Sequence, residues 1–190
     1  AKLVASDGAW FDYFGESVAV SGNRALVSAD AHDHAGDNSG AAYAFERMAG
    51  GWLQAQEVTA FDADPQDRFG ISLALEGAVA AVGAPGDEDA GSSAGAGYVF
   101  RRTTAGWVQL GKLLAKDWHT GQLLGCAVGV SGTSVVLGAF GDDAACPGNV
   151  WCISGSGYAF EFVPEAFQYG SCASSAPCSN TDAHGGCRNS

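Results

Sequence analysis

The sequence predicts an all-β fold built from three repeated units of four strands, and two observations support that prediction. Three stretches of the chain share one plan, and their marker glycines Gly15, Gly70 and Gly125 are each 55 residues apart. Within each stretch, apolar residues alternate with small or polar ones over short runs, which is typical of strands, and no segment keeps a helical period. Repetition at such a length is typical of proteins in which one small unit packs on the next.

Each repeat contains four β-like runs. In the second repeat the first two runs are ISLALEG and VAAVGA, and the turn at Gly77 between them predicts a tight hairpin. A long loop rich in Gly, Asp and Ser follows, then a third run around Tyr98 and a fourth run that starts near Trp107. Four antiparallel strands in this order predict the blade of a β-propeller, so the expected fold is β-propeller-type.

The residues around the marker glycines carry a family resemblance. The stretches YFGESVAV and RFGISLAL, followed by ALVSAD and AAVGAPGDED, resemble the FG-GAP repeat, which builds the propeller of integrin α-subunits and of many secreted proteins. The resemblance implies three four-stranded FG-GAP blades, in repeats of about 2–56, 57–111 and 112–163, with a Cys-rich tail at 164–190. The third repeat departs from the pattern because Leu124 precedes its marker glycine.

Charge and hydropathy exclude two classes of partner. The 190-residue chain has a net charge of −12 and no basic stripe, which argues against nucleic acid. No apolar run approaches the ~20 residues of a membrane-spanning helix, so no membrane span is expected. The negative charge suits cation binding or solubility alone.

Six cysteines predict disulfides and therefore an extracellular, secreted or cell-surface protein. Cys146 and Cys152 bracket a short insertion, and we expect them to pair. Six cysteines allow 15 pairings, and the sequence does not choose among the rest. A zinc site that combines cysteines with His184 is the disfavoured alternative, because no C-x-x-C pair is present. The remaining candidates for disulfides are Cys126, Cys172, Cys178 and Cys187.

Acidic residues gather in the loops after the second run of each repeat. Carboxylates on Gly-rich loops suit Ca²⁺, and the family resemblance supports calcium as a possible cofactor. The loops lack the D-x-D-x-D-G run of strong calcium sites, so solvated acidic loops are the alternative. The candidate ligands are Asp30, Asp33, Asp87, Glu88, Asp89, Asp142 and Asp143.

Two further polar patterns have structural interpretations that we favour. Asp7, Asp62 and Asp117 recur at one repeat position, which predicts side chains that hydrogen-bond their own backbone in a turn. His32 and His34 could bind a transition metal with Asp30 or Asp33, but no other repeat offers these ligands and solvated histidines are the favoured interpretation.

Enzymatic interpretations are weak, and we expect a protein that is not an enzyme. The letters GSSAG match the nucleophile elbow at Ser93, but that elbow needs a strand before it and a helix after it. The flanks of Ser93 predict a loop and a strand instead. No pair of carboxylates stands apart from the repeated loops as an acid–base couple.

Aromatic residues that break the repeat are candidates for an interface. Trp10 and Phe11 occupy loop positions that are Pro65 and Gln66 in the second repeat. Unrepeated aromatic residues on loops are either interaction anchors or covers for a blade end.

The two ends of the repeat region predict assembly. The run Lys2, Leu3, Val4, Ala5 corresponds to the second half of a fourth strand, whereas the third repeat starts its own fourth strand near Phe167 and Tyr169 and then enters the tail. Closed propellers need four or more blades, so we expect blade completion by strand exchange between copies. Such contacts give a ring or a filament.

Two functions follow from this interpretation. The favoured one is a non-enzymatic extracellular structural protein whose partner is itself, joined head to tail by addition of the N-terminal strand to the incomplete third blade. The alternative is an integrin-like, calcium-dependent module for adhesion or for binding an extracellular ligand or glycan.

Overall fold

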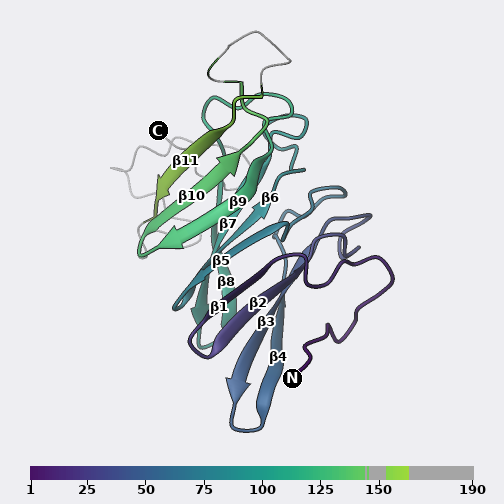
Figure 1. Cartoon of the computed structure of the whole chain (residues 1–190). Coiled ribbons are helices and arrows are strands. Elements are labelled where there is room, and N and C mark those ends of the chain that lie inside the picture. The colour runs from purple at the N-terminus through teal and green to yellow at the C-terminus, as the bar shows by residue number, and fades with distance from the viewer. Residues whose placement is uncertain (144, 146–152, 163–190) are drawn as a thin grey trace.

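The structure is a computed structural model that describes residues 1–143, 145 and 153–162, and its regular elements there are all strands. Figure 1 shows three antiparallel sheets that follow one another along the chain, from the purple first sheet to the green third one. Blades 1 and 2 have four strands each in sequence order, as predicted. Blade 1 contains β1 (Val18–Ser21), β2 (Arg24–Ala29), β3 (Ala41–Met48) and β4 (Gly51–Val58). Blade 2 contains β5 (Ser72–Glu76), β6 (Val79–Ala84), β7 (Ala96–Thr103) and β8 (Gly106–Leu113).

Blade 3 has three described strands, in the order β11-β10-β9. They are β9 (Leu124–Ser131), β10 (Ser134–Ala139) and β11 (Ser156–Glu161). The expected start of a fourth strand at Phe167 and Tyr169 lies outside the described residues. No helix long and apolar enough to cross a membrane is present in the part of the chain that the structure describes.

The tight hairpins predicted at the start of each repeat are confirmed. Ser21 pairs with Arg24 at the end of β1 and β2, and Glu76 pairs with Val79 in blade 2. Each two-residue turn needs a left-handed backbone, which glycine adopts without strain, and Gly22 and Gly77 have φ values of 60° and 56°.

Neighbouring blades pack through two unlike faces, because successive side chains of a strand point to opposite sides of its sheet. We call the side that contacts the next blade the forward face and the side that contacts the preceding blade the rear face. Side chains on the rear face of blade 2 pack on Leu26, Ala42 and Ala44, which lie on the forward face of blade 1. Blade 3 packs in the same way on blade 2, where Leu137 and Phe160 meet Ala81 and Val99.

Glycines on the forward face of blade 2 allow blade 3 to approach closely. A Cβ atom on Gly83 would lie 1.9 Å from the carbonyl oxygen of Gly125, and one on Gly97 would lie 2.4 Å from Leu137 Cδ1. Glycine is therefore required at both positions for this packing.

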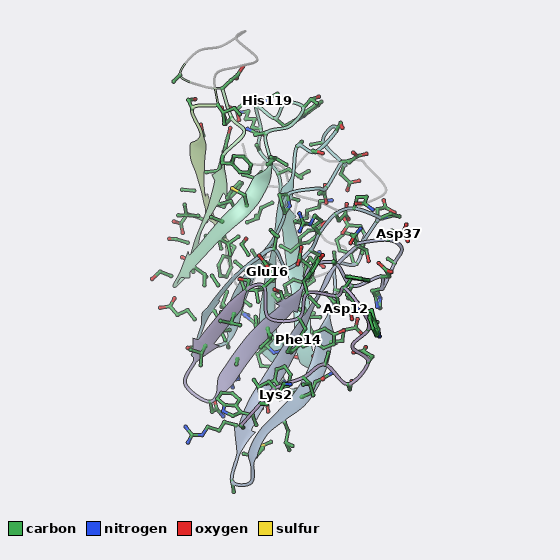
Figure 2. All side chains as sticks on the ribbon, turned by 45° about the vertical axis from the view of Figure 1, so that its right-hand side comes forward. Lys2, Asp12, Phe14, Glu16, Asp37 and His119 are labelled. Atoms are coloured by element: carbon green, nitrogen blue, oxygen red, sulfur yellow. The ribbon has the colours of Figure 1, made fainter. Side chains whose placement is uncertain are left out.

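The N-terminal residues differ from the expected strand. Lys2–Ala5 belong to no strand, and Leu3 and Ala5 pack against the apolar cluster of blade 1 that contains Tyr43 and Phe45. The Ser6 N–H donates to Gln54 Oε1 (2.9 Å), and Gln54 Nε2 donates back to Ser6 Oγ (3.0 Å). Figure 2 shows Lys2 beside the strands of blade 1. The sequence predicts that this segment completes the third blade of another copy as a strand; within one chain it packs on blade 1, where Leu3 and Ala5 are partly buried.

Candidate functional site

Each blade places one tyrosine of its third strand next to a group of ionisable side chains. These tyrosines are Tyr43, Tyr98 and Tyr158, at one repeat position. We call the polar group around each of them the tyrosine cluster of that blade. The three clusters occupy the same place in the fold but contain different residues, so each has its own chemistry.

The tyrosine cluster of blade 2 is built around a buried lysine. Lys112 Nζ lies 2.6 Å from Asp87 Oδ2, 2.6 Å from Asp89 Oδ2 and 3.0 Å from Asp62 Oδ2. The hydroxyl of Tyr98 donates to Asp87 Oδ2 at 2.8 Å. A hollow above this group is lined by Asp62, Asp64, Pro65, Asp67, Asp87, Glu88 and Asp89.

Burial and charge set the protonation of blade 2's cluster. Burial lowers the pKa of Lys112, but the carboxylates of Asp87, Asp89 and Asp62 raise it more, so the net pKa is above its ordinary value. Burial also raises the pKa of Asp87, against the opposing effect of Lys112. Burial raises the pKa of Asp67 to about 7. The cluster therefore holds a permanent ammonium group and one carboxyl group that titrates near neutral pH.

The tyrosine cluster of blade 1 reverses this charge pattern. His32 and His34 take the repeat positions of Asp87 and Asp89, and Glu57 takes the position of Lys112. His34 Nδ1 lies 3.0 Å from Glu57 Oε1, and His32 Nε2 lies 3.7 Å from the same oxygen. The other ring nitrogen of His32, Nδ1, is 3.2 Å from Asp12 Oδ2.

The tyrosine cluster of blade 3 combines acids with amide and imidazole groups. Asp142 Oδ2 accepts hydrogen bonds from the Tyr158 hydroxyl (2.8 Å) and from Gln122 Nε2 (3.0 Å). His119 Nε2 lies 3.8 Å from both Asp142 Oδ1 and Asp143 Oδ1. Figure 2 places His119 at the blade 3 end of the molecule and Asp12 beside blade 1, so the two clusters are separate.

The structure does not bring the seven predicted calcium ligands into one site. Asp30 is fully buried and binds the Arg68 guanidinium group, with Oδ2 2.5 Å from Nη2. Asp33 accepts the Asn38 N–H at 2.8 Å, which closes its loop. Asp87 and Asp89 bind Lys112, Glu88 is exposed, and Asp142 and Asp143 lie near His119. A metal ion in blade 2 would have to displace the ammonium group.

The recurrent aspartates have a further role besides the turns that they occupy. Asp62 binds Lys112 in blade 2. In blades 1 and 3, burial raises the pKa of Tyr43 and Tyr158, and the neighbouring Asp7 and Asp117 raise it further. Each aspartate therefore faces the tyrosine cluster of its blade.

Two sequence motifs can be placed directly. Ser93 has a φ of 47° and precedes β7, not a helix, so no nucleophile elbow is formed. Cys126, expected in a disulfide, is a free thiol in β9 that donates to the Gly138 carbonyl oxygen at 3.3 Å. The other sequence candidates Cys146, Cys152, Cys172, Cys178, Cys187 and His184 lie outside the described residues.

The unrepeated aromatic pair is on the surface. Trp10 and Phe11 are 89% and 74% exposed, and their rings meet edge to face with centroids 6.4 Å apart. Nothing among the described residues covers them, which leaves the interface interpretation open.

Sequence reasoning missed several residues of the clusters. They are Asp12, Glu57, Asp67, Lys112, His119 and Gln122. A signal was present, because the repeat alignment shows the change from Asp87 to His32 together with the change from Lys112 to Glu57. Opposite changes of charge at two repeat positions indicate that their side chains meet.

Comparison with protein families agrees with this architecture. The model of the FG-GAP repeat matches residues 1–45, 52–100 and 107–160. The chain belongs to the FG-GAP repeat family. No curated protein matches it. The blades of this FG-GAP chain are thus the family's repeats.

Proposed function

We propose that this FG-GAP chain is a non-enzymatic extracellular structural protein whose copies join head to tail, blade 3 of one copy to blade 1 of the next. The observation that carries the proposal is the exposure of two blade faces. Val18 on the rear face of blade 1 is 67% exposed, whereas its equivalent Leu73 in blade 2 is 9% exposed, and Val20 on the same face of blade 1 is 68% exposed. Val136 on the forward face of blade 3 is 49% exposed, whereas Ala81 is fully buried.

The two faces have complementary shapes. A Cβ on Gly157, on the forward face of blade 3, would have no atom of the described residues within 4 Å, whereas a Cβ at the equivalent Gly97 of blade 2 would meet the side chain of Leu137. The repeat equivalent of Leu137 on blade 1 is Val27, which lies on the rear face. A second copy could therefore seat Val27 over Gly157 as Leu137 sits over Gly97.

Backbone hydrogen bonds between blades follow one pattern, which could continue between copies. The N–H groups of Arg68 and Phe69 donate to the carbonyl oxygens of Asn38 and Ser39 (both 3.0 Å). Between blades 2 and 3, the N–H groups of Leu123 and Leu124 donate in the same way to the carbonyl oxygens of Ser93 (3.1 Å) and Ala94 (2.9 Å). At the proposed junction, the equivalent donors are the N–H groups of Tyr13 and Phe14 in one copy. The equivalent acceptors are the carbonyl groups of Ile153 and Ser154 in the other copy.

The donor segment of blade 1 already has the required backbone. Tyr13 has a φ of 54°, close to the 55° of Arg68 and the 59° of Leu123. Left-handed backbone is strained for residues other than glycine and needs support from its surroundings. Because Tyr13 already has this backbone conformation, its segment has the shape that the contact between blades requires. Trp10 and Phe11 lie next to this segment in the sequence.

The N-terminal segment supports the same junction. Val58 of β4 pairs with Ala42, and Leu113 of β8 pairs with Gly97. The equivalent pair is Leu3 of one copy and Gly157 of the other. Burial of a leucine contributes about 1.5–3 kcal/mol, and each new backbone hydrogen bond about 1 kcal/mol.

Charge also suits this arrangement. Lys2 is the repeat equivalent of Lys112, which lies opposite Tyr98 and binds Asp87. In the proposed assembly, Lys2 lies opposite Tyr158 and brings its ammonium group to Asp142. The docking of the N-terminal segment on blade 1 is compatible with this assembly. Its Ser6–Gln54 contact is equivalent to the hydrogen bond from the Phe61 N–H to Gln109 Oε1 (3.1 Å), which joins blades 1 and 2.

Sedimentation velocity over a range of protein concentrations tests the proposal. We expect the wild type to form larger species as concentration rises, and the variants Leu3→Asp and Lys2→Glu to remain monomers. Lys116→Glu makes the same charge change at an exposed residue and should assemble normally. A wild type that stays monomeric, or a variant without residues 1–6 that assembles normally, would contradict the proposal. A monomer that instead binds immobilised glycans or cell-surface proteins would favour the adhesion alternative.

A further inference from the structure

We infer that the tyrosine cluster of blade 1 is a binding site for a divalent transition-metal ion of the Zn²⁺ type, with His32, His34 and Glu57 as ligands. The ligand atoms of these three residues all lie within 4.8 Å of one another. Two imidazoles and one carboxylate form a ligand set typical of zinc sites. This inference does not depend on assembly of the chain.

The two distances from Glu57 to the histidines are close to those between ligands of a tetrahedral site. Zinc binds nitrogen and oxygen at ~2.0–2.1 Å, so two ligands of a tetrahedral ion are about 3.3 Å apart. Glu57 Oε1 is 3.0 Å from His34 Nδ1 and 3.7 Å from His32 Nε2, values on either side of that separation. Small side-chain adjustments would therefore admit the ion.

Asp12 positions the first imidazole. Its Oδ2 atom lies 3.2 Å from His32 Nδ1, so the carboxylate holds the proton on Nδ1 and leaves the Nε2 lone pair directed at the cluster. Asp12 is buried and is itself fixed by the Ala9 N–H at 2.6 Å. A carboxylate behind a histidine ligand is the usual support of zinc sites.

Glu57 supplies an oxygen with no hydrogen bond of its own. Its Oε1 atom is buried and accepts no hydrogen bond from the described residues, although His34 Nδ1 is within ion-pair distance. A buried carboxylate oxygen without a donor is costly, and a cation would satisfy it. Glu57 belongs to β4 and pairs with Tyr43 of β3, so the sheet fixes its place in the cluster.

The other two clusters show why the inference is confined to blade 1. In blade 2 the equivalent place is taken by the Lys112 ammonium group. In blade 3 the ligand atoms of His119, Asp142 and Asp143 also lie within 4.8 Å of one another, but they offer a single imidazole, and Asp142 already accepts two hydrogen bonds. Blade 1 alone among the described clusters offers two imidazoles. His34 is exposed, which provides an entry path and room for a water molecule as fourth ligand.

Metal content and cobalt spectroscopy of the full chain test the inference. After dialysis against Zn²⁺, we expect His34→Ala and Glu57→Gln to bind one equivalent fewer than the wild type, whereas the matched variant His119→Ala keeps it. Co²⁺ bound in four-coordinate geometry should give visible absorption bands that the same two variants lose. The comparison between variants removes any contribution from cysteines elsewhere in the chain.

The role of Asp12 gives a second measurement. Asp12→Asn should weaken zinc binding by about 10–100-fold without a change in stoichiometry, because it removes the support and not a ligand. Far-UV circular dichroism checks that each variant is folded. The inference is overturned if folded His34→Ala and Glu57→Gln bind as much zinc as the wild type, or if the wild type shows no cobalt bands. In that case Glu57 serves only as an ion-pair partner for the histidines.

Discussion

Lys112 Nζ lies 2.6 Å from Asp87 Oδ2, and both side chains are almost completely buried. Replacement of the lysine by glutamine should therefore leave buried carboxylates without their counter-ion. Loss of one partner from a buried ion pair typically costs about 3–5 kcal/mol. We expect a loss of that size in the free energy of unfolding of Lys112→Gln, measured with urea at neutral pH.

The same variant tests whether the acidic loop of blade 2 can bind calcium. The ammonium group fills the acidic loop in the wild type, so removal of Lys112 leaves Asp62, Asp87 and Asp89 free to bind a hard cation. Calcium should raise the melting temperature of Lys112→Gln more than that of the wild type, by mass action on the folded state. Lys116→Gln is the control at an exposed site. Equal responses to calcium in all three proteins would show that the loop of blade 2 does not bind it.

The buried carboxyl group of Asp67 predicts a pH dependence. Burial raises its pKa to about 7 in the folded state, above the value of about 3.9 in an unfolded chain. The folded state therefore keeps this proton at a pH where the unfolded chain has lost it. This contribution to stability is complete below about pH 4 and is lost as the pH rises through 7.

Asp67→Asn isolates this effect from that of the other carboxylates. The asparagine stays neutral and can still accept the Asp64 N–H, which lies 2.8 Å from Asp67 Oδ2. Relative to the wild type, the variant should gain on the order of 2 kcal/mol in unfolding free energy between about pH 4 and pH 8. Glu88→Gln, at an exposed position beside the same hollow, should show no such trend. Parallel pH profiles for the wild type and Asp67→Asn would refute the prediction.

Two glycines at one repeat position should respond differently to substitution. A side chain on Gly97 would meet Leu137, so Gly97→Val should destabilise the chain by about 1–3 kcal/mol through overpacking. Among the residues that the structure describes, none lies within 4 Å of a Cβ at Gly157, so Gly157→Val should leave the monomer's stability almost unchanged. In the proposed assembly Gly157 receives Val27, so this variant should shift sedimentation towards the monomer. Unfolding curves and sedimentation separate the two effects, and a Gly157→Val protein that assembles like the wild type would argue against the packing proposed for blade 3.

The strands of the blades could be predicted from the sequence, because period two and the turn glycines act locally. The tyrosine clusters could not. A register shift between Val99 and Phe100 places Lys112 opposite Tyr98, whereas an unbroken ladder would place Gly111 there. A bulge of this kind decides which residue faces the cluster, and no residue pattern in β8 announces it. The docking of Leu3 on blade 1 was also missed, because alternation in a short run does not tell which surface will bury it.

The cysteines are a test of the extracellular assignment. We expect mass spectrometry of an unreduced digest to recover Cys146 linked to Cys152 and to find Cys126 as a free thiol, because the latter is held in β9 beside Gly138. Iodoacetamide applied before and after unfolding reports on the accessibility of Cys126. Six free thiols would contradict both the pairing and the oxidising compartment.

A designed cross-link tests the register of the junction between copies. The proposed assembly places Leu3 of one copy directly opposite Gly157 of the next, at the position where Leu113 faces Gly97. Paired residues of antiparallel strands have Cα atoms ~4.5–5.5 Å apart, which is within the range that a disulfide spans. A chain that carries both Leu3→Cys and Gly157→Cys should therefore form covalent dimers and larger species under mild oxidation, seen by non-reducing electrophoresis.

The matched control moves one partner along the same strand. Glu161 lies four residues from Gly157 in β11, about 13 Å away, which is beyond the reach of a disulfide. The combination of Leu3→Cys with Glu161→Cys should give only the background of oxidation from the native cysteines. Equal cross-linking in both chains would mean that the N-terminal segment meets blade 3 without the register that the repeats dictate, and no cross-linking in either would mean that the two segments do not meet.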